Sequence, residues 1–152
     1  MNPSSKFYDL IVSFEGLKLN AYKDSVGIAT IGIGTIKYPT GKAVVMGDVC
    51  TKHQAFEYLY NELKQKSATV NFYMTGLTIN QNQFDALLSF TYNVGTGALM
   101  VSTLLKKIKI NVNDPSIRTE FMKWNKGKVN GVLTALPGLT KRRAAEADLY
   151  FS

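Results

Sequence analysis

The sequence has little of the chemistry that supports a metal centre or a disulfide framework. Its 152 residues include one cysteine, Cys50, and one histidine, His53, which excludes an internal disulfide and a cysteine- or histidine-rich zinc site. No apolar run is long enough to span a bilayer, and the first residues lack the apolar core of a signal peptide. We therefore expect a protein that needs no metal or cofactor and is made in a cytoplasm without a signal peptide.

Positive charge is concentrated in the C-terminal third. Residues 1–100 carry eight Lys or Arg against seven Asp or Glu, whereas residues 101–152 carry ten against four. A basic surface of this kind attracts a polyanion, and charge alone leaves nucleic acid, anionic lipid and an anionic cell-wall polymer open. Because no groove-reading motif is recognisable, we expect no nucleic-acid partner.

The N-terminal third predicts one helix followed by a small sheet. Apolar residues recur at helical spacing from Phe7 to Phe14, which predicts a short amphipathic helix ending at Gly16. From Leu19 to Tyr38 the helical period disappears, and glycines alternate with β-branched residues. This composition predicts a hairpin or a three-stranded sheet with tight turns.

Helices are predicted for most of the remaining chain. Capping boxes begin at Thr51 and Asn80, and the patterns after them predict a long helix to about Tyr73 and a buried helix that Gly95 stops. Further helices are predicted over residues 102–110, 114–124 and 137–149. We therefore predict a mostly helical α+β domain with five or six helices around one small sheet.

Two carboxylates of the N-terminal third lie in unlike settings. Glu15 is predicted at a helix C-terminus beside apolar neighbours, and both features favour the protonated carboxyl that a general acid requires. Asp24 is predicted in an exposed polar turn, and two carboxyls in unlike environments are typical of glycoside hydrolysis. Taken singly, each fits an ordinary helix-end or turn residue, and Thr30 fits an ordinary strand residue.

The joint spacing of these residues is more specific. The pattern E-G-x4-A-Y-x-D-x5-T-I-G-x-G resembles the catalytic signature of the phage-type lysozymes, endolysins that hydrolyse peptidoglycan. Further segments resemble that family in its order, namely T-K-H-Q-A, Q-F-D-A-L-L-S-F-T-Y-N-V-G, S-T-L-L and L-P-G-L-T-K-R-R-A-A-E. The resemblance covers nearly the whole chain.

The resemblance implies a lysozyme-like fold with a cleft between two lobes. The small β-sheet lobe would span residues 16–50, a connecting helix residues 51–74, and the helical lobe residues 1–15 plus 75–152. The resemblance also implies roles for three side chains. Glu15 would be the general acid, Asp24 the second catalytic carboxylate, and Thr30 the third member that holds a water.

The resemblance implies further residues around the bond that is cleaved. Contacts to the glycan are implied for Ile36, Tyr92 and Thr103. Either Arg142 or Arg143 lies where relatives place a basic residue near the acid. Thr35 stands where many members carry His after G-I-G, a difference that bears on cleft geometry more than on the reaction.

The function implied is that of a muramidase for host cell lysis, cleaving the β-1,4 bond between N-acetylmuramic acid and N-acetylglucosamine. Its partner would be the peptidoglycan glycan strand, and we expect a monomer that leaves the host cytoplasm through a holin pore. The basic C-terminal third would face acidic wall polymers or an anionic membrane. Two alternatives stay open: a lytic transglycosylase acting on the same bond, which Asp24 and Thr30 disfavour, and a non-catalytic cationic wall- or membrane-binding protein.

Overall fold

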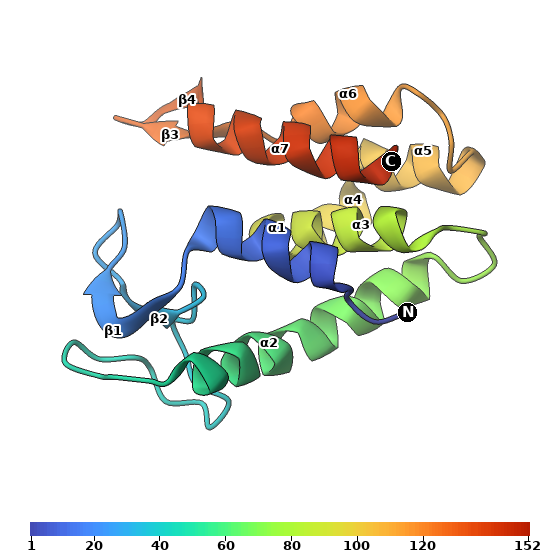
Figure 1. The fold of residues 1–152 in the computed structure, drawn as a ribbon. Coiled ribbons are helices and arrows are strands. Elements are labelled where there is room, and N and C mark those ends of the chain that lie inside the picture. Colours follow the sequence, from blue (N-terminus) through green and yellow to red (C-terminus); the bar gives the residue numbers. More distant parts are fainter. The chain divides into compact units, whose positions relative to one another are not determined.

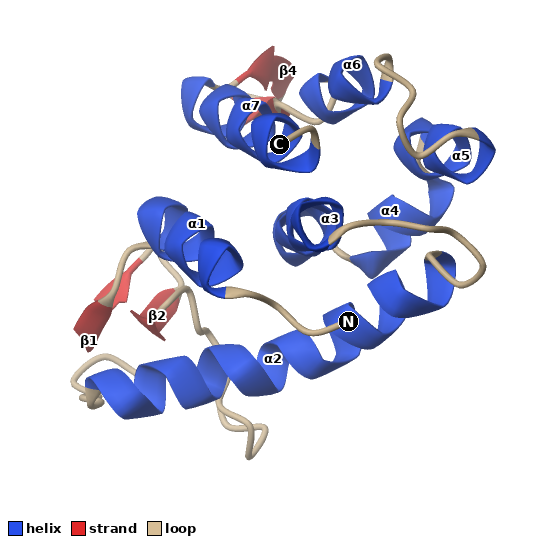
Figure 2. Cartoon of the chain, turned by 45° about the vertical axis from the view of Figure 1, so that its right-hand side comes forward, coloured by secondary structure: helices blue, strands red, loops and turns tan.

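The protein is described by a computed structural model of all 152 residues, which contains seven helices and four short strands (Figures 1 and 2). The elements in chain order are α1 (Ser5–Glu15), β1 (Lys18–Lys23), β2 (Ala29–Gly32), α2 (Lys52–Tyr73), α3 (Gln81–Val94), α4 (Thr96–Val101), α5 (Thr103–Ile110), α6 (Ile117–Met122), β3 (Lys126–Val129), β4 (Val132–Ala135) and α7 (Pro137–Tyr150). No helix combines the length and the apolar character needed to cross a membrane.

The chain divides into two compact units. The hairpin unit is Tyr8–Gln65, and the helical unit consists of Met1–Phe7 and Lys66–Ser152. The helix α2 contributes residues to both units, since it runs without interruption from Lys52 to Tyr73.

In the hairpin unit, strands β1 and β2 form an antiparallel pair beside a small apolar core. The core residues are Ile31, Val44, Cys50 and Ala55. Gly32 has a φ of +65°, and a Cβ at that position would lie 3.1 Å from the Cβ of Ala55 on α2. Glycine at this position therefore lets the sheet approach the first turn of the long helix.

The helical unit is organised around α3, of which nine consecutive residues, from Gln83 to Thr91, are buried. The capping box predicted at Asn80 is present, because its side chain accepts from the backbone N–H of Gln83 while the Gln83 side chain accepts from the Asn80 N–H. Edge-to-face aromatic contacts pack α3 against the C-terminal part of the chain, with ring centroids 5.6 Å apart for Phe90 and Phe121.

The prediction of one small sheet is wrong, because the helical unit contains a second hairpin, β3–β4. Its turn is Asn130-Gly131, with φ values of 48° and 80°. An Asn-Gly pair between two valines is a strong signal for a two-residue hairpin turn, so this strand pair was predictable from the local sequence. The helix α4 is a further difference from the prediction, which ends one helix at Gly95 and begins the next at residue 102.

Candidate active site

Glu15 is the last residue of α1, as the sequence predicted. The helix ends there because Gly16 adopts a φ of +73°, a conformation that glycine enters at little cost. The backbone N–H of Gly16 donates to the carbonyl of Val12, which closes the final turn. The Glu15 side chain is half-buried and is held where the helix passes into strand β1.

Asp24 forms the turn that joins β1 to β2. Its Oδ1 accepts hydrogen bonds from the backbone N–H groups of Val26 (2.9 Å) and Ile28 (2.8 Å). The second oxygen, Oδ2, makes no hydrogen bond to the chain. The side chain therefore has the structural role of a turn cap, which fixes its orientation, and it keeps one oxygen available to a ligand.

Thr30 lies on β2 and is almost fully buried, with 3% of its surface exposed. Its hydroxyl donates to the carbonyl of Ile28 at 3.0 Å. Since a carbonyl can only accept, the hydroxyl hydrogen is committed to this bond. The Thr30 oxygen is then left as an acceptor for a ligand or a water.

Tyr22 interacts with Glu15, Asp24 and Thr30, although no role was predicted for it. It pairs with Thr30 across the hairpin, and the ammonium group of Lys18 lies 4.1 Å from the centre of its ring. Burial raises the pKa of the Tyr22 hydroxyl, and the negative charges of Glu15 and Asp24 raise it further. The phenol is therefore within electrostatic range of both carboxyl groups, and the A-Y-x-D segment of the signature was the sequence signal for it.

Thr35 closes the glycine turn that follows β2. Its backbone N–H and carbonyl pair with Ile31 at 3.0 and 2.8 Å, while Gly32 and Gly34 supply the positive φ values of the loop. The Thr35 side chain is 2% exposed, and its hydroxyl has no hydrogen-bond partner. The position for which the resemblance implies His in many family members is thus a buried site with an unsatisfied hydroxyl.

The residues predicted to contact the glycan fall in both units. Ile36 belongs to the hairpin unit, where its side chain is exposed and lines a cavity. Tyr92 and Thr103 belong to the helical unit. Tyr92 is half-buried on α3 with the Lys66 ammonium 5.2 Å from its ring centre, and Thr103 is the exposed first residue of α5.

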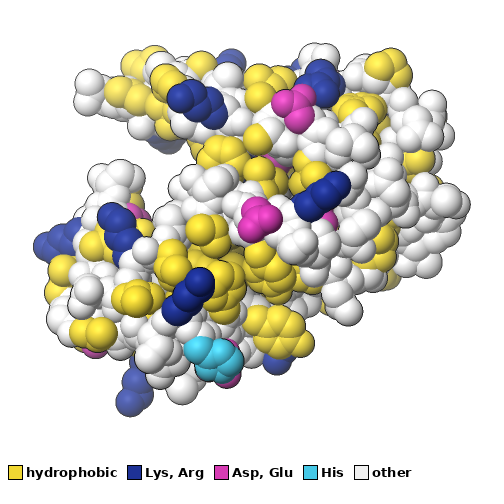
Figure 3. Space-filling view, viewed as in Figure 1, with side chains coloured by type: hydrophobic (Ala, Val, Ile, Leu, Met, Phe, Trp, Pro, Cys, Tyr) yellow, Lys and Arg dark blue, Asp and Glu magenta, His cyan; other side chains and the backbone are white.

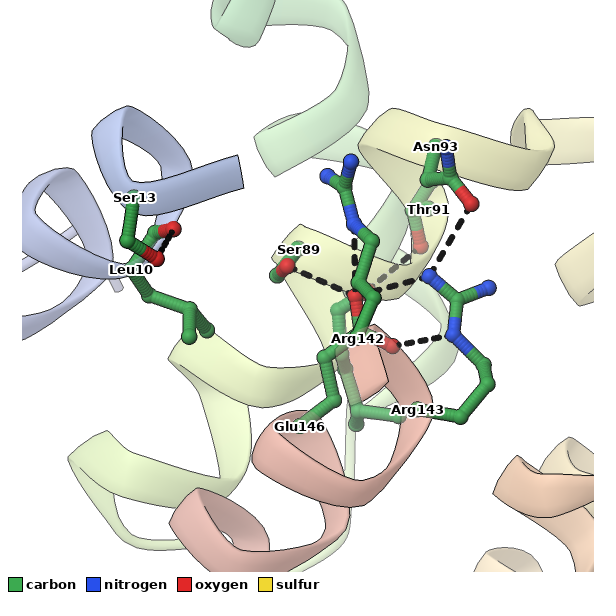
Figure 4. Close-up of polar contacts among 9 residues, drawn as sticks. Leu10, Ser13, Ser89, Thr91, Asn93, Arg142, Arg143 and Glu146 are labelled. Carbon is green, nitrogen blue, oxygen red and sulfur yellow. Dashed lines mark hydrogen bonds and ion pairs between the residues drawn. The ribbon is translucent and has the colours of Figure 1, made fainter. Parts of the chain in front are cut away.

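Both candidate arginines belong to a buried ion cluster of the helical unit (Figure 4). Arg142 and Arg143 on α7 contact the Glu146 carboxylate at 3.3 and 2.8 Å, and Ser89 on α3 donates to it at 2.7 Å. Burial raises the pKa of Glu146, and the two guanidinium groups oppose that effect. Arg143 also donates to Asn93, next to Tyr92, and so helps to hold the end of α3.

The excess positive charge of the C-terminal third is partly neutralised in the fold. Ion pairs to Glu120, Glu146 and Asp148 engage half of the ten basic residues in this region, namely Lys107, Arg118, Lys123, Arg142 and Arg143. On the face drawn in Figure 3, the Lys and Arg side chains stand apart among apolar and neutral surface. No group of three or more His, Cys, Asp or Glu is arranged to hold a metal ion.

Comparisons with known proteins identify the family. The family model for phage lysozyme matches residues 12–146. An endolysin of Acyrthosiphon pisum secondary endosymbiont phage 1 is 43% identical over 100% of this chain and 99% of its own length. Among solved structures, the endolysin from Escherichia coli O157:H7 phage FAHEc1 is 43% identical with a TM-score of 0.93, over 99% of this chain and 93% of that one.

A second solved structure extends the likeness beyond phage proteins. The muramidase domain of SpmX from Asticaccaulis excentricus is 30% identical with a TM-score of 0.84, over 99% of this chain and 98% of that one. These matches span the segment that contains Glu15, Asp24 and Thr30, and they agree with the mostly helical α+β architecture. The chain belongs to the phage lysozyme family and is a glycoside hydrolase of bacterial peptidoglycan.

Proposed function

We propose that the enzyme is an inverting muramidase that cleaves the β-1,4 bond between N-acetylmuramic acid and N-acetylglucosamine. Glu15, Asp24 and Thr30 carry the reaction. The observation that supports this assignment is the position of Tyr22. Its backbone pairs with that of Thr30 across the hairpin, and burial together with the negative charges of Glu15 and Asp24 raises the pKa of its hydroxyl. The similar muramidase domain from Asticaccaulis excentricus supports the choice of bond.

In this mechanism Glu15 protonates the glycosidic oxygen as the bond to the leaving sugar breaks. The positive charge that develops on the sugar ring is stabilised by the Asp24 carboxylate, whose orientation is fixed by two backbone N–H groups. Because the Thr30 hydroxyl hydrogen is committed to Ile28, the Thr30 oxygen accepts a hydrogen bond from the attacking water, which keeps that hydrogen in the product. Asp24 takes the other proton of that water, which attacks the face opposite the leaving group and inverts the anomeric centre.

Replacing Glu15 by Gln tests the general acid. Loss of a general acid lowers rates by about 10²–10⁴-fold, so the variant should clear purified cell walls at least a hundred times more slowly. Asp9→Asn is the matched control, because Asp9 is an exposed acid on the same helix. Equal clearing by the two variants, with unchanged circular dichroism, would refute the role of Glu15.

The products distinguish the muramidase from a lytic transglycosylase. Hydrolysis adds a water and leaves a reducing N-acetylmuramic acid, whereas transglycosylation leaves an anhydro sugar of lower mass. We expect mass spectrometry of a wall digest to find only the hydrated product, and proton NMR of the fresh digest to find the α-anomer first. An initial β-anomer would indicate retention and contradict the water-holding role of Thr30.

We also propose that the enzyme acts in host cell lysis after release from the host cytoplasm through a holin pore, as a monomer. The excess of basic residues in positions 101–152 supports contact with acidic wall polymers or an anionic membrane surface. Expression in bacterial cells with and without a co-expressed holin tests the release step. Lysis should require the holin, and lysis by the enzyme alone would reject this route.

A further inference from the structure

A small aromatic cavity of the hairpin unit shares no residue with the catalytic assignment. Its lining residues are Tyr8, His53, Phe56, Glu57 and Tyr60, all of them in this unit. On the face drawn in Figure 3, apolar side chains gather between α1 and α2. The cavity volume is about 240 Å³, below the roughly 300–1,000 Å³ that is usual for a whole small-molecule ligand. The cavity therefore suits a single head group.

The helix α2 builds most of this cavity through its periodicity. Four of the lining residues stand at positions i, i+3, i+4 and i+7 of the helix and so share one face, namely His53, Phe56, Glu57 and Tyr60. Tyr8 lines the cavity from α1, and its ring meets that of Phe56 edge to face, with centroids 6.2 Å apart and an interplanar angle of 61°. The two rings hold each other in place, so a ligand would meet a corner that is already formed.

The electrostatics of the cavity favour a cation. Three of its five lining residues are aromatic, and the face of an aromatic ring attracts positive charge. Glu57 adds a full negative charge, and neither Lys nor Arg lines the cavity, although the protein has a net charge of +7. The Nε2 atom of His53 lies 3.6 Å from the Glu57 carboxylate and balances its charge only when the imidazole is protonated. With a neutral His53, the cavity presents an uncompensated carboxylate beside aromatic rings.

One ring of the cavity already has an ammonium group of the chain beside it. The Lys64 ammonium lies 5.1 Å from the centre of the Tyr60 ring while it donates to Asn61, and Lys64 is not among the lining residues. We propose that the cavity binds an alkylammonium group, either the primary amine of a lysine-like side chain or a quaternary trimethylammonium group. Both carry positive charge on C–H groups that pack against aromatic faces, and both pair with a carboxylate. The site requires neither the proposed bond cleavage nor a glycan contact.

The single histidine makes the binding test direct. His53 lines the cavity and gives the only imidazole signals in the proton NMR spectrum of the protein. Choline, Nα-acetyl-lysine amide and dimethylbutanol, the uncharged carbon isostere of choline, are titrated at about pH 8, where imidazoles are ordinarily neutral, against sodium chloride at equal ionic strength. We expect the two ammonium compounds to move the His53 signals at millimolar concentrations, because exposed cation–π contacts are individually weak, and dimethylbutanol to leave them in place. The tighter of the two ammonium compounds identifies the source, quaternary or primary, and either result supports the site.

Two variants at exposed side chains test the walls without threatening the fold. Glu57→Gln removes the charge of the cavity, and Tyr60→Leu removes one aromatic face. Each should weaken choline binding about two- to fivefold, the range expected for an exposed charge pair or cation–π contact. Unchanged circular dichroism confirms that the variants are folded.

Other residues of α2 supply the matched controls. Glu62 lines a different cavity of the hairpin unit, of about 430 Å³, whose walls include Ile36, Tyr38 and Tyr58. Phe72 is an exposed aromatic residue that lines a third cavity. Glu62→Gln and Phe72→Leu therefore remove a charge and a ring from the same helix, and they should leave choline binding unchanged.

Three results would overturn the proposal. The first is an equal movement of the His53 signals with dimethylbutanol, which would make the cavity an apolar site without preference for charge. The second is the absence of any movement at about 50 mM choline or lysine amide, well above the millimolar range. The third is equal affinity in the Glu57 and Glu62 variants, or in the Tyr60 and Phe72 variants, since binding would then occur elsewhere on the protein.

Discussion

Replacing Thr35 by Val should stabilise the protein. The two side chains have nearly the same shape, so the exchange replaces a hydroxyl by a methyl group in a site that is 2% exposed. The Thr35 hydroxyl has no partner there, while its backbone groups are already paired with Ile31. An unsatisfied polar group in a buried site costs about 1–3 kcal/mol, and valine removes that cost while keeping the packing.

The expected gain in the free energy of unfolding is about 1–2 kcal/mol, the lower part of that range, because a hydroxyl is a small group. Proteins gain about 2.1 cal/mol/K of entropy per residue on unfolding, which is roughly 0.32 kcal/mol/K for the 152 residues of this chain. The melting temperature should therefore rise by about 3–6 °C. Differential scanning calorimetry and urea titration give the two quantities independently.

Thr91→Val is the matched control for this change. Thr91 is also fully buried, but its hydroxyl donates to the carbonyl of Leu87 at 2.7 Å. The same exchange there removes a made hydrogen bond and should lower the free energy of unfolding by about 0.5–1.5 kcal/mol. If Thr35→Val also lowers stability, the hydroxyl has a partner such as a buried water, and the reasoning is refuted.

Three further predictions concern the ion cluster, the glycine turn and acid sensitivity. Glu146→Gln removes the buried counter-charge of Arg143 and should cost about 3–5 kcal/mol in urea titration, against less than ~1 kcal/mol for Asp148→Asn, which breaks a surface pair on the same helix. A smaller loss for Glu146→Gln would mean that the cluster relaxes. Gly32→Ala combines a φ of +65° with a close contact to Ala55 and should lower the free energy of unfolding by about 1–3 kcal/mol; an unchanged melting temperature would contradict the tight fit. The Val45 N–H and the Tyr38 hydroxyl hold the pKa of Asp48 below its usual value, so its contribution is present above the usual carboxyl pKa and is lost as the pH falls through the lower pKa of the folded protein. Tyr38→Phe should make that acid-side loss of stability shallower in urea titrations, and an identical pH dependence would count against the Asp48 contact.

Features built from neighbouring residues were predictable from the sequence. The end of α1 at Glu15 follows from Gly16, and the capping box at Asn80 follows from the side chain three residues later. The turn at Asp24 is likewise closed by N–H groups two and four residues away. The sequence was enough to place Glu15 at a helix end, Asp24 in a turn and Thr30 on a strand, whereas it assigned Glu15 to the helical lobe and the structure includes it in the hairpin unit.

Features that join distant residues required the fold. Ser89 and Glu146 are 57 positions apart, and no local pattern in the sequence indicates that their side chains meet in the core. The cavity walls at Tyr38 and Tyr58 likewise come from a loop and a helix. The second hairpin lies between these two classes, because Asn130-Gly131 marks its turn locally although no element was predicted between residues 124 and 137.

The sequence alone thus determined the local structure around the proposed catalytic residues and the order in which they occur, because capping, turn formation and the spacing of a signature depend on nearby residues. Only the tertiary structure decided their environments. It put Tyr22 within electrostatic range of both acids, left the Thr35 hydroxyl without a partner, and formed a cavity lined by Ile36 and two tyrosines. The physical reason is that burial, electrostatic range and cavity shape depend on packing between segments that the chain order does not bring together.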